Sequence, residues 1–96
     1  MSQRLTSFSL PVQIIKQKNR YIAYTPVLDL STSGRSVVEA KKRFAEIVDL
    51  FFEEIIEAGT LHSVLDELGW RKVDKNWQPP QIVSQNSVNF KIPALA

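Results

Sequence analysis

The chain has 96 residues, of which 44% are hydrophobic and 23% are charged, and its formal net charge is +2. These values are ordinary for one small globular domain, and the charge is too small to argue for nucleic-acid binding by itself. The absence of cysteine excludes disulfides and thiolate chemistry and fits the cytoplasm. No apolar run approaches the ~20 residues that span a bilayer, and the first residues lack the apolar stretch of a signal peptide. We therefore expect a cytoplasmic protein without a membrane partner.

Three strands are predicted in the first third of the chain. Apolar and polar residues alternate with a period of two over residues 8–14, which is typical of a half-buried strand, and Pro11 favours an edge position. Asn19 tolerates the positive φ of the hairpin turn that we expect next. Further strands follow at residues 21–25 and 28–32. Three strands with short links most simply form an antiparallel meander.

One long helix is predicted after the third strand, because the hydrophobic period changes from two to about 3.6 over residues 31–40. Gly34 can adopt a backbone conformation that is closed to residues with a Cβ, which suits the sharp turn out of the strand. Ser36 and Glu39 form the S-x-x-E pattern of a capping box. The helix should run from Ser36 to Ala58 and extend about 35 Å.

The long predicted helix has two contrasting faces. At ~100° per residue its acidic residues and Lys42 share one stripe, whereas its apolar residues cover about 180° of the surface. A helix that lies on one core needs an apolar arc of only ~100°. The excess predicts that one flank covers the sheet and the other meets something else. The apolar residues are Val37, Ala40, Phe44, Ile47, Val48, Phe51, Phe52, Ile55 and Ile56.

Gly59 is predicted to end this helix, and Thr60 to cap a short second helix that Gly69 stops. A fourth strand is predicted at residues 70–73. The fold class is therefore α+β, with the order β-β-β-α-α-β. We expect a domain over residues 1–78 and an extended tail over residues 79–96. Alternation of Val88, Phe90 and Ile92 marks a possible strand at residues 88–92, which would need a sheet edge of its own chain or of a neighbouring subunit.

The sequence offers little that is arranged for catalysis. His62, the one histidine, supplies neither a metal ligand set nor a base with an orienting partner, so a solvated helix residue is the simplest interpretation. No Gly-rich phosphate loop, nucleophile elbow or zinc-protease motif occurs. Aromatic and basic residues around Tyr21, Tyr24, Trp70 and Trp77 could stack on nucleic acid, but a core position for Trp70 is the simpler interpretation. We expect no enzyme, no cofactor and no metal site.

The acidic stripe is either a solvated face or a docking surface for a basic protein. Its C-terminal acids lie where the helix macrodipole disfavours negative charge, and an outward-pointing leucine lies among them. The residues that we expect to dock a partner are Glu46, Asp49, Leu50, Glu53 and Glu57.

The succession Tyr21-Ile-Ala-Tyr-Thr-Pro26, Leu28-Asp-Leu-Ser-Thr-Ser-Gly34 and Ser36-Val-Val-Glu-Ala40, followed by a long helix, resembles the HicB-like antitoxin family. The resemblance covers roughly residues 8–80. It implies a truncated ribonuclease-H-like sheet without catalytic carboxylates, a dimer or tetramer, and masking of HicA, a small basic RNA-cleaving toxin. Many members carry a C-terminal DNA-binding domain, which we do not expect here. The family's Pro-Gly-Cys near the third strand is replaced by residues 27–31.

We therefore predict a non-catalytic HicB-like antitoxin, or a stand-alone relative, that masks such a toxin and does not bind nucleic acid without a partner. The alternative is a DNA-binding regulator of ribbon-helix-helix type, although three strands before the first helix argue against it. A hydrolase with a concealed metal site around Asp29 is the weakest hypothesis. Self-association is expected through one helix flank and the tail, by Phe51, Phe52, Ile55, Ile56, Trp77, Val88, Phe90 and Ile92.

Overall fold

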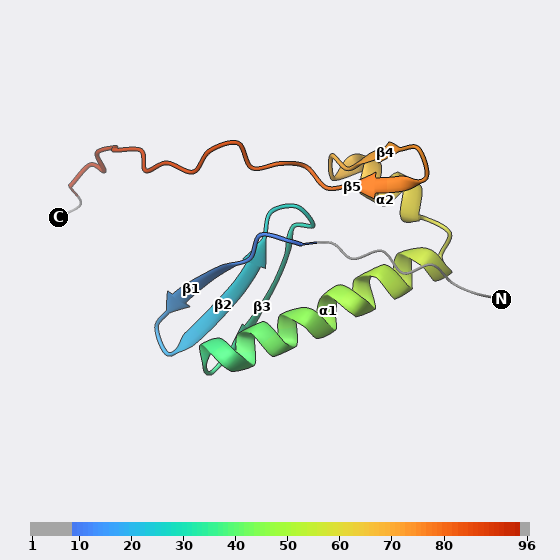
Figure 1. Ribbon diagram of the computed structural model, residues 1–96. Helices are drawn as coiled ribbons and strands as arrows, with labels where there is room; N and C mark the ends of the chain where they lie inside the picture. Colours follow the sequence, from blue (N-terminus) through green and yellow to red (C-terminus); the bar gives the residue numbers. More distant parts are fainter. Residues whose placement is uncertain (1–8, 95–96) are drawn as a thin grey trace.

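The computed structural model describes residues 9–94 and confirms the α+β fold class (Figure 1). Three strands form an antiparallel meander in the order β1-β2-β3, and a second sheet pairs two further strands. The elements are β1 (Gln13–Gln17), β2 (Arg20–Thr25), β3 (Leu30–Gly34), α1 (Val37–Glu57), α2 (Leu61–Glu67), β4 (Arg71–Val73) and β5 (Asn76–Gln78). The sequence predicted this order except for β5.

β1 lies further along the chain than the alternation of residues 8–14 predicted. Its pairing with β2 begins at Gln13, opposite Tyr24, and Phe8 lies outside the described residues. Pro11 comes just before the paired segment, and β1 is an edge strand of the sheet, as Pro11 predicted. A residue without an N–H group is tolerated there because one side of the strand has no neighbour.

A two-residue turn sets the register of β1 and β2. Gln17 pairs with Arg20 across Lys18 and Asn19. Lys18 has the positive φ of this turn, 56°, so the expectation that Asn19 would take it is wrong. The backbone of Lys18 therefore has the left-handed conformation, which residues with a Cβ adopt only at a cost in free energy.

β3 also begins two residues later than predicted. Val27 and Leu28 belong to the link between β2 and β3, and both are buried. The next residue, Asp29, has a φ of 51°, so the link turns sharply before β3 begins. Apolar character at Leu28 thus reflects a buried loop residue rather than a strand residue.

The start of α1 follows the predicted capping box only in part. Ser36 Oγ accepts a hydrogen bond of 3.0 Å from the N–H of Glu39, as predicted. The Glu39 carboxylate accepts its bond from the N–H of Arg35 rather than from that of Ser36, at 3.1 Å. Gly34 does not have a positive φ, so the conformational reason given for it is wrong. A Cβ at Gly34 would instead lie 2.6 Å from the backbone nitrogen of Ala40.

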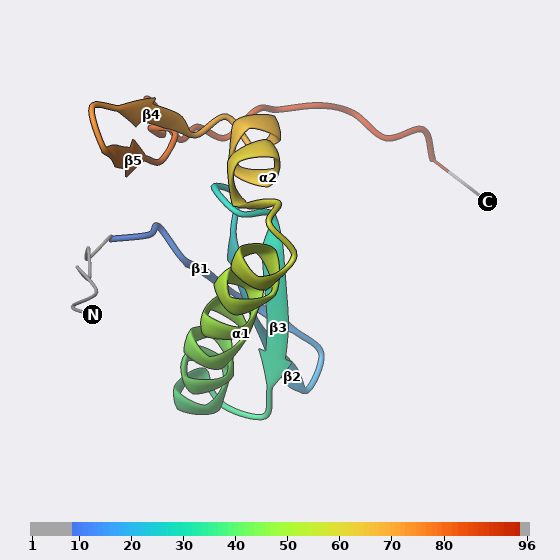
Figure 2. The same cartoon turned by 90° about the vertical axis from the view of Figure 1, so that its right-hand side faces the viewer.

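The wide apolar arc of α1 is explained largely by packing within the chain. Its N-terminal half lies on the sheet, chiefly over β3 and β2, where Ala40 and Phe44 pack with Ala23 (Figure 2). Its C-terminal half packs against α2 and Trp70, and Ile55 is buried there. One helix thus covers two core clusters, one at each end.

Both helices end in a Schellman motif. At the end of α1, Gly59 has a φ of 71°, and the N–H of Thr60 donates to the carbonyl of Ile55 at 2.8 Å. Gly69 ends α2 in the same way, with a φ of 88°. Thr60 is the N-cap residue of α2, as predicted, but its side chain makes no capping hydrogen bond, because its hydroxyl donates back to the carbonyl of Ile55 at 3.4 Å.

A short hairpin and an extended tail complete the described chain. β4 and β5 pair antiparallel, and Asp74 in the turn between them has a φ of 57°. Residues 79–94, called the tail below, contain no helix or strand and extend away from the domain (Figures 1 and 2). The possible strand at residues 88–92 pairs with no strand of the described chain. A pairing with a neighbouring subunit stays a prediction.

Candidate protein-binding surface

Charge is segregated along the exposed face of α1. Lys41, Lys42 and Arg43 lie in its N-terminal half, and the acidic residues of the predicted stripe, apart from Glu39 in the first turn, lie from Glu46 to the C-terminal end. This order opposes the helix macrodipole, which favours acids at the N-terminus and bases at the C-terminus. The last turn of α1 has no basic residue within the described chain. Apart from Glu39, the distribution of charge along α1 is therefore unfavourable to the macrodipole.

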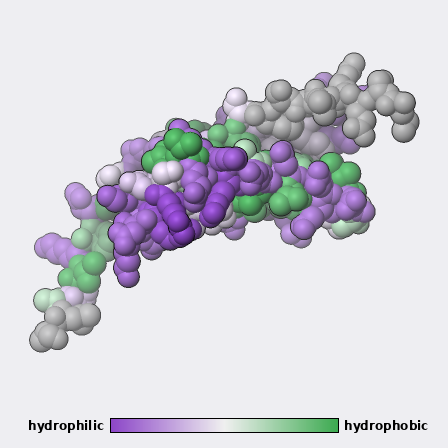
Figure 3. Space-filling view, turned by 90° about the horizontal axis from the view of Figure 1, so that it is seen from below, coloured by the Kyte–Doolittle hydropathy of each residue, from purple (hydrophilic) through white to green (hydrophobic). Residues whose placement is uncertain are grey.

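The acidic half of α1 forms a continuous exposed surface. Leu50 lies within it and is 57% exposed, as the sequence predicted. Figure 3, seen from the side on which α1 lies, shows mostly hydrophilic side chains with separate hydrophobic patches among them. The surface, called the acidic patch below, brings together all five predicted docking residues: Glu46, Asp49, Leu50, Glu53 and Glu57.

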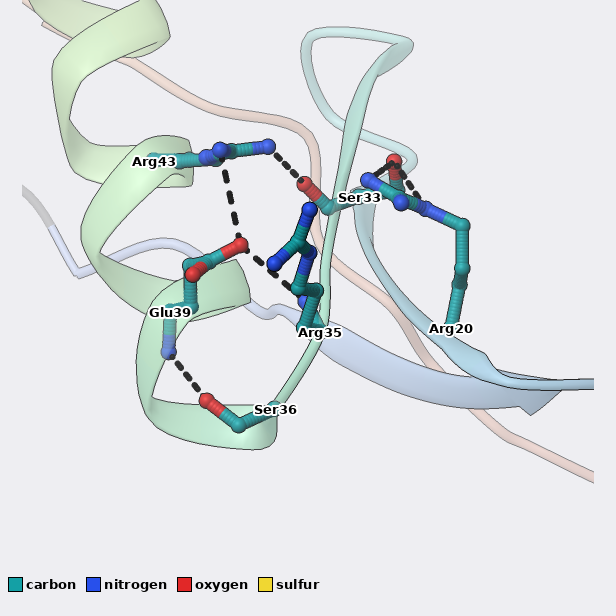
Figure 4. A network of polar contacts seen from close by, with 6 residues as sticks. All are labelled: Arg20, Ser33, Arg35, Ser36, Glu39 and Arg43. Carbon is teal, nitrogen blue, oxygen red and sulfur yellow. Dashed lines mark hydrogen bonds and ion pairs between the residues drawn. The ribbon is translucent and has the colours of Figure 1, made fainter.

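The basic half of α1 is fixed to the sheet by a polar network (Figure 4). Arg43 donates to the carbonyl of Ser33 at 3.2 Å and lies 3.4 Å from the Glu39 carboxylate. The hydrogen bond from the Arg35 N–H to the Glu39 carboxylate holds the pKa of Glu39 below its usual range, and the charges of Arg43 and Arg35 lower it further. Arg20 on β2 donates to the Ser33 hydroxyl. These arginines stabilise the junction of β3 and α1.

The predicted self-association residues of α1 do not form one exposed patch. Ile55 is buried inside the chain, so it is not available for contacts with another molecule. Phe51 and Phe52 are half-buried and pack edge to face at 5.4 Å, and Phe52 also meets the ring of Trp70. Ile56 is 60% exposed. Of these four, Ile56 offers the most surface.

Trp77 lies apart from the predicted helix flank. It is half-buried on β5, 5.2 Å from the His62 ring between centroids, and Lys72 Nζ lies 5.9 Å from its ring centroid. Through this contact between Trp77 and His62, the β4–β5 hairpin packs against α2. The remaining predicted residues, Val88, Phe90 and Ile92, are exposed on the tail.

A shallow apolar groove beside β1 was not predicted. It has a volume of about 220 Å³ and is lined by Val12, Ile14, Lys41, Phe44 and Ala45. The sequence predicted only that Val12 and Ile14 share the apolar face of a half-buried strand, because alternation does not show that α1 lies chiefly over β3 and β2. The only usable signal was the edge position that Pro11 indicated.

The titratable groups of residues 9–94 do not converge on a reaction centre. Desolvation raises the pKa of Tyr24, and the hydrogen bond of 3.2 Å that its hydroxyl donates to Asp29 raises it further. His62 is exposed on α2. No three His, Asp or Glu side chains among these residues gather in a way that could hold a metal ion.

Comparison with known proteins gives no match to a family model, to a curated protein or to a solved structure. None of the helices in residues 9–94 has the length and apolar composition that a membrane crossing requires.

Proposed function

We propose that this protein is a non-catalytic binding protein of the HicB antitoxin type, which masks a small basic RNA-cleaving toxin. The observation that carries the proposal is the acidic patch. It places four carboxylates and the exposed Leu50 on one rigid helix. A basic protein partner would supply the cations that the C-terminal half of α1 lacks.

Charge and an apolar centre have different roles in such a contact. Opposite charges steer the encounter and suppress wrong partners, and an apolar anchor contributes most when it is fully desolvated. Leu50 is the apolar centre of the acidic patch. The masking mechanism needs no catalytic group, because covering the active site of the toxin suffices. The protein would act as a homo-oligomer, which is a further part of the proposal.

Co-expression with the neighbouring reading frame tests the proposal, if that frame encodes a small basic protein with a central histidine. We expect the two proteins to co-purify, and the purified complex to cleave RNA less than the free partner does. Leu50→Asp and Glu53→Lys should each weaken binding by at least about tenfold. Glu67→Lys on α2 makes the same charge change outside the acidic patch and should change binding by less than about threefold.

Two results would overturn the proposal. The first is full RNA cleavage in the presence of excess protein. The second is equal weakening by Glu53→Lys and Glu67→Lys, because a general charge effect would then explain the binding.

A DNA-binding regulator is the second candidate, and the basic end of the domain favours it. The β1–β2 turn and the start of α1 present Lys18, Arg20, Arg35, Lys41 and Lys42, which are all exposed. The short α2, with seven residues, argues against a ribbon-helix-helix arrangement. Binding to upstream DNA that weakens steeply with salt, and that Lys41→Glu abolishes, would favour this candidate over the first.

A further inference from the structure

The tail carries three large apolar side chains that are mostly exposed within residues 9–94. Val88, Phe90 and Ile92 are 79%, 77% and 74% exposed, and the polar residues Asn89 and Lys91 alternate with them. In an extended chain, residues two apart point to the same side. If residues 88–92 formed a strand, the three apolar side chains would therefore lie on one of its faces.

One edge of the three-stranded sheet is open to receive such a strand. Because Gln17 and Arg20 close a two-residue turn, they form a hydrogen-bonded pair, and such pairs alternate along β1 and β2. The main-chain N–H and C=O groups of Ile14 and Lys16 therefore face away from β2. Within the described chain, no backbone group outside the strands bonds to them.

The opposite edge of the sheet is less accessible. By the same alternation, the carbonyl of Ser33 on β3 points outwards, and Arg43 donates a hydrogen bond of 3.2 Å to it. A strand added at β3 would have to displace this arginine and its ion pair with Glu39. β1 is thus the edge that favours strand addition.

The apolar groove lies on the face of β1 that a new strand would extend. Val12 and Ile14 line it from the β1 side, and Phe44 and Ala45 line it from α1. A strand beside β1 would place alternate side chains next to Val12 and Ile14 on this face. The period of two in residues 88–92 matches that spacing.

The geometry of the tail favours a second copy of the chain over its own β1. A groove lined by Ser9, Pro11 and residues 78–82 shows that the tail starts beside the segment that leads into β1. Only six residues of chain, 12–17, separate Pro11 from the end of β1. An extended segment alongside them advances at the same rate per residue, so residues 88–92 would run past Gln17 of their own chain.

We propose that residues 88–92 of one chain add as a strand to the β1 edge of a second copy, with Val88, Phe90 and Ile92 covering the apolar groove. In this exchange each copy receives the tail of the other, so both tails and both open edges are used. It therefore closes as a twofold dimer. This inference gives the homo-oligomer of the proposed function a specific interface, and it can be tested apart from toxin binding, since the acidic patch takes no part in it.

Substitutions in the tail test the exchange without disturbing the fold of the single chain, because these side chains are exposed. Light scattering coupled to size exclusion should show a dimer for the unchanged protein. Phe90→Asp should raise the dimer dissociation constant by at least about a hundredfold. Asn89→Asp adds the same charge one residue away, on the opposite face, and should change it by less than about threefold.

Cross-linking identifies which chain the tail contacts, and the absence of natural cysteine makes it clean. We would mix Ala45→Cys protein with Val88→Cys or Ile92→Cys protein, equilibrate them and oxidise. A covalent dimer in at least one mixture supports the exchange. A chain that carries both cysteines serves as the control for contacts within one chain. The proposal would be overturned if the unchanged protein were monomeric or if the Phe90→Asp protein stayed dimeric. It would also be overturned if disulfides formed only within the chain that carries both cysteines.

Discussion

The indole nitrogen of Trp70 donates a hydrogen bond of 2.8 Å to the carbonyl oxygen of Val27, 43 residues earlier in the chain. Both residues are buried. The bond joins the segment after α2 to the link between β2 and β3, so it connects the C-terminal part of the domain to the sheet. Leu28, the next residue of the link, packs against Trp70 in the same cluster.

Replacing Trp70 with phenylalanine should destabilise the protein by about 1–3 kcal/mol, because the buried Val27 carbonyl loses this donor. Urea denaturation followed by circular dichroism measures the change. Trp77→Phe is the matched control. It keeps an aromatic ring beside His62 at a half-buried position and should cost less. Equal losses for the two variants would mean that the hydrogen bond to Val27 contributes nothing.

Thr25→Val should stabilise the protein. The hydroxyl of Thr25 is fully buried, and no hydrogen-bond partner for it exists in residues 9–94. A buried hydroxyl without a partner has lost its hydration, and valine has nearly the same shape without the polar atom. We expect the free energy of unfolding to rise by about 1 kcal/mol. Thr32→Val, at a half-buried strand position, serves as the control, and a loss of stability at Thr25 would contradict the assignment.

Gly34→Ala should destabilise the protein by about 1–3 kcal/mol, because the new methyl group would meet the backbone of α1 rather than a side chain that can move. Gly59→Ala is the comparison that separates a steric clash from an unfavourable backbone conformation as the cause of destabilisation. Nothing lies within 4 Å of its Cβ position, but its φ is 71°. Thermal denaturation should show that Gly59→Asn is milder than Gly59→Ala, whereas Gly34→Asn is at least as harmful as Gly34→Ala. The opposite order at Gly34 would contradict the close approach.

Acid should remove the contribution of Glu39. The pKa of this carboxyl is lowered in the folded protein, so its stabilisation is complete above the pKa of the unfolded chain. It is lost as the pH falls through the lowered folded pKa. The difference in unfolding free energy between the unchanged protein and Glu39→Gln should therefore shrink between about pH 7 and pH 3. Glu46→Gln is the exposed control on the same helix, and a difference that is independent of pH would contradict the network.

The hydrophobic period sufficed to predict the elements whose signals are local. The helix bounds, the Ser36 hydrogen bond to Glu39, the Gly59 end of α1 and the exposure of Leu50 all depend on residues within a few positions of each other. The shifts of β1 and β3 depend on pairing between strands. Residues 8–14 alternate, but the turn at Lys18 determines which residues face β2.

For the candidate site too, the sequence predicted what depends on local spacing and missed what depends on how the elements cross. The five docking residues share one helix face, so helical spacing alone brought them together. The burial of Ile55 and the groove at Val12 and Ile14 depend on where α1 crosses the sheet and where α2 and Trp70 fold back. No local pattern encodes that crossing. β5 was missed because three residues are too short for a periodic signal, and the turn at Asp74 carries no glycine.

The two core clusters of the domain are not independent, because Leu30 and Val48 contact both. If the C-terminal half of α1 unfolds, Val48 and Leu30 lose contacts in both clusters, so the packing on the sheet is weakened as well, although the two clusters lie at different ends of the helix. The small domain should accordingly lose its structure in a single cooperative transition. Slow-exchanging amides should then be found on β2 and on both halves of α1 with similar protection.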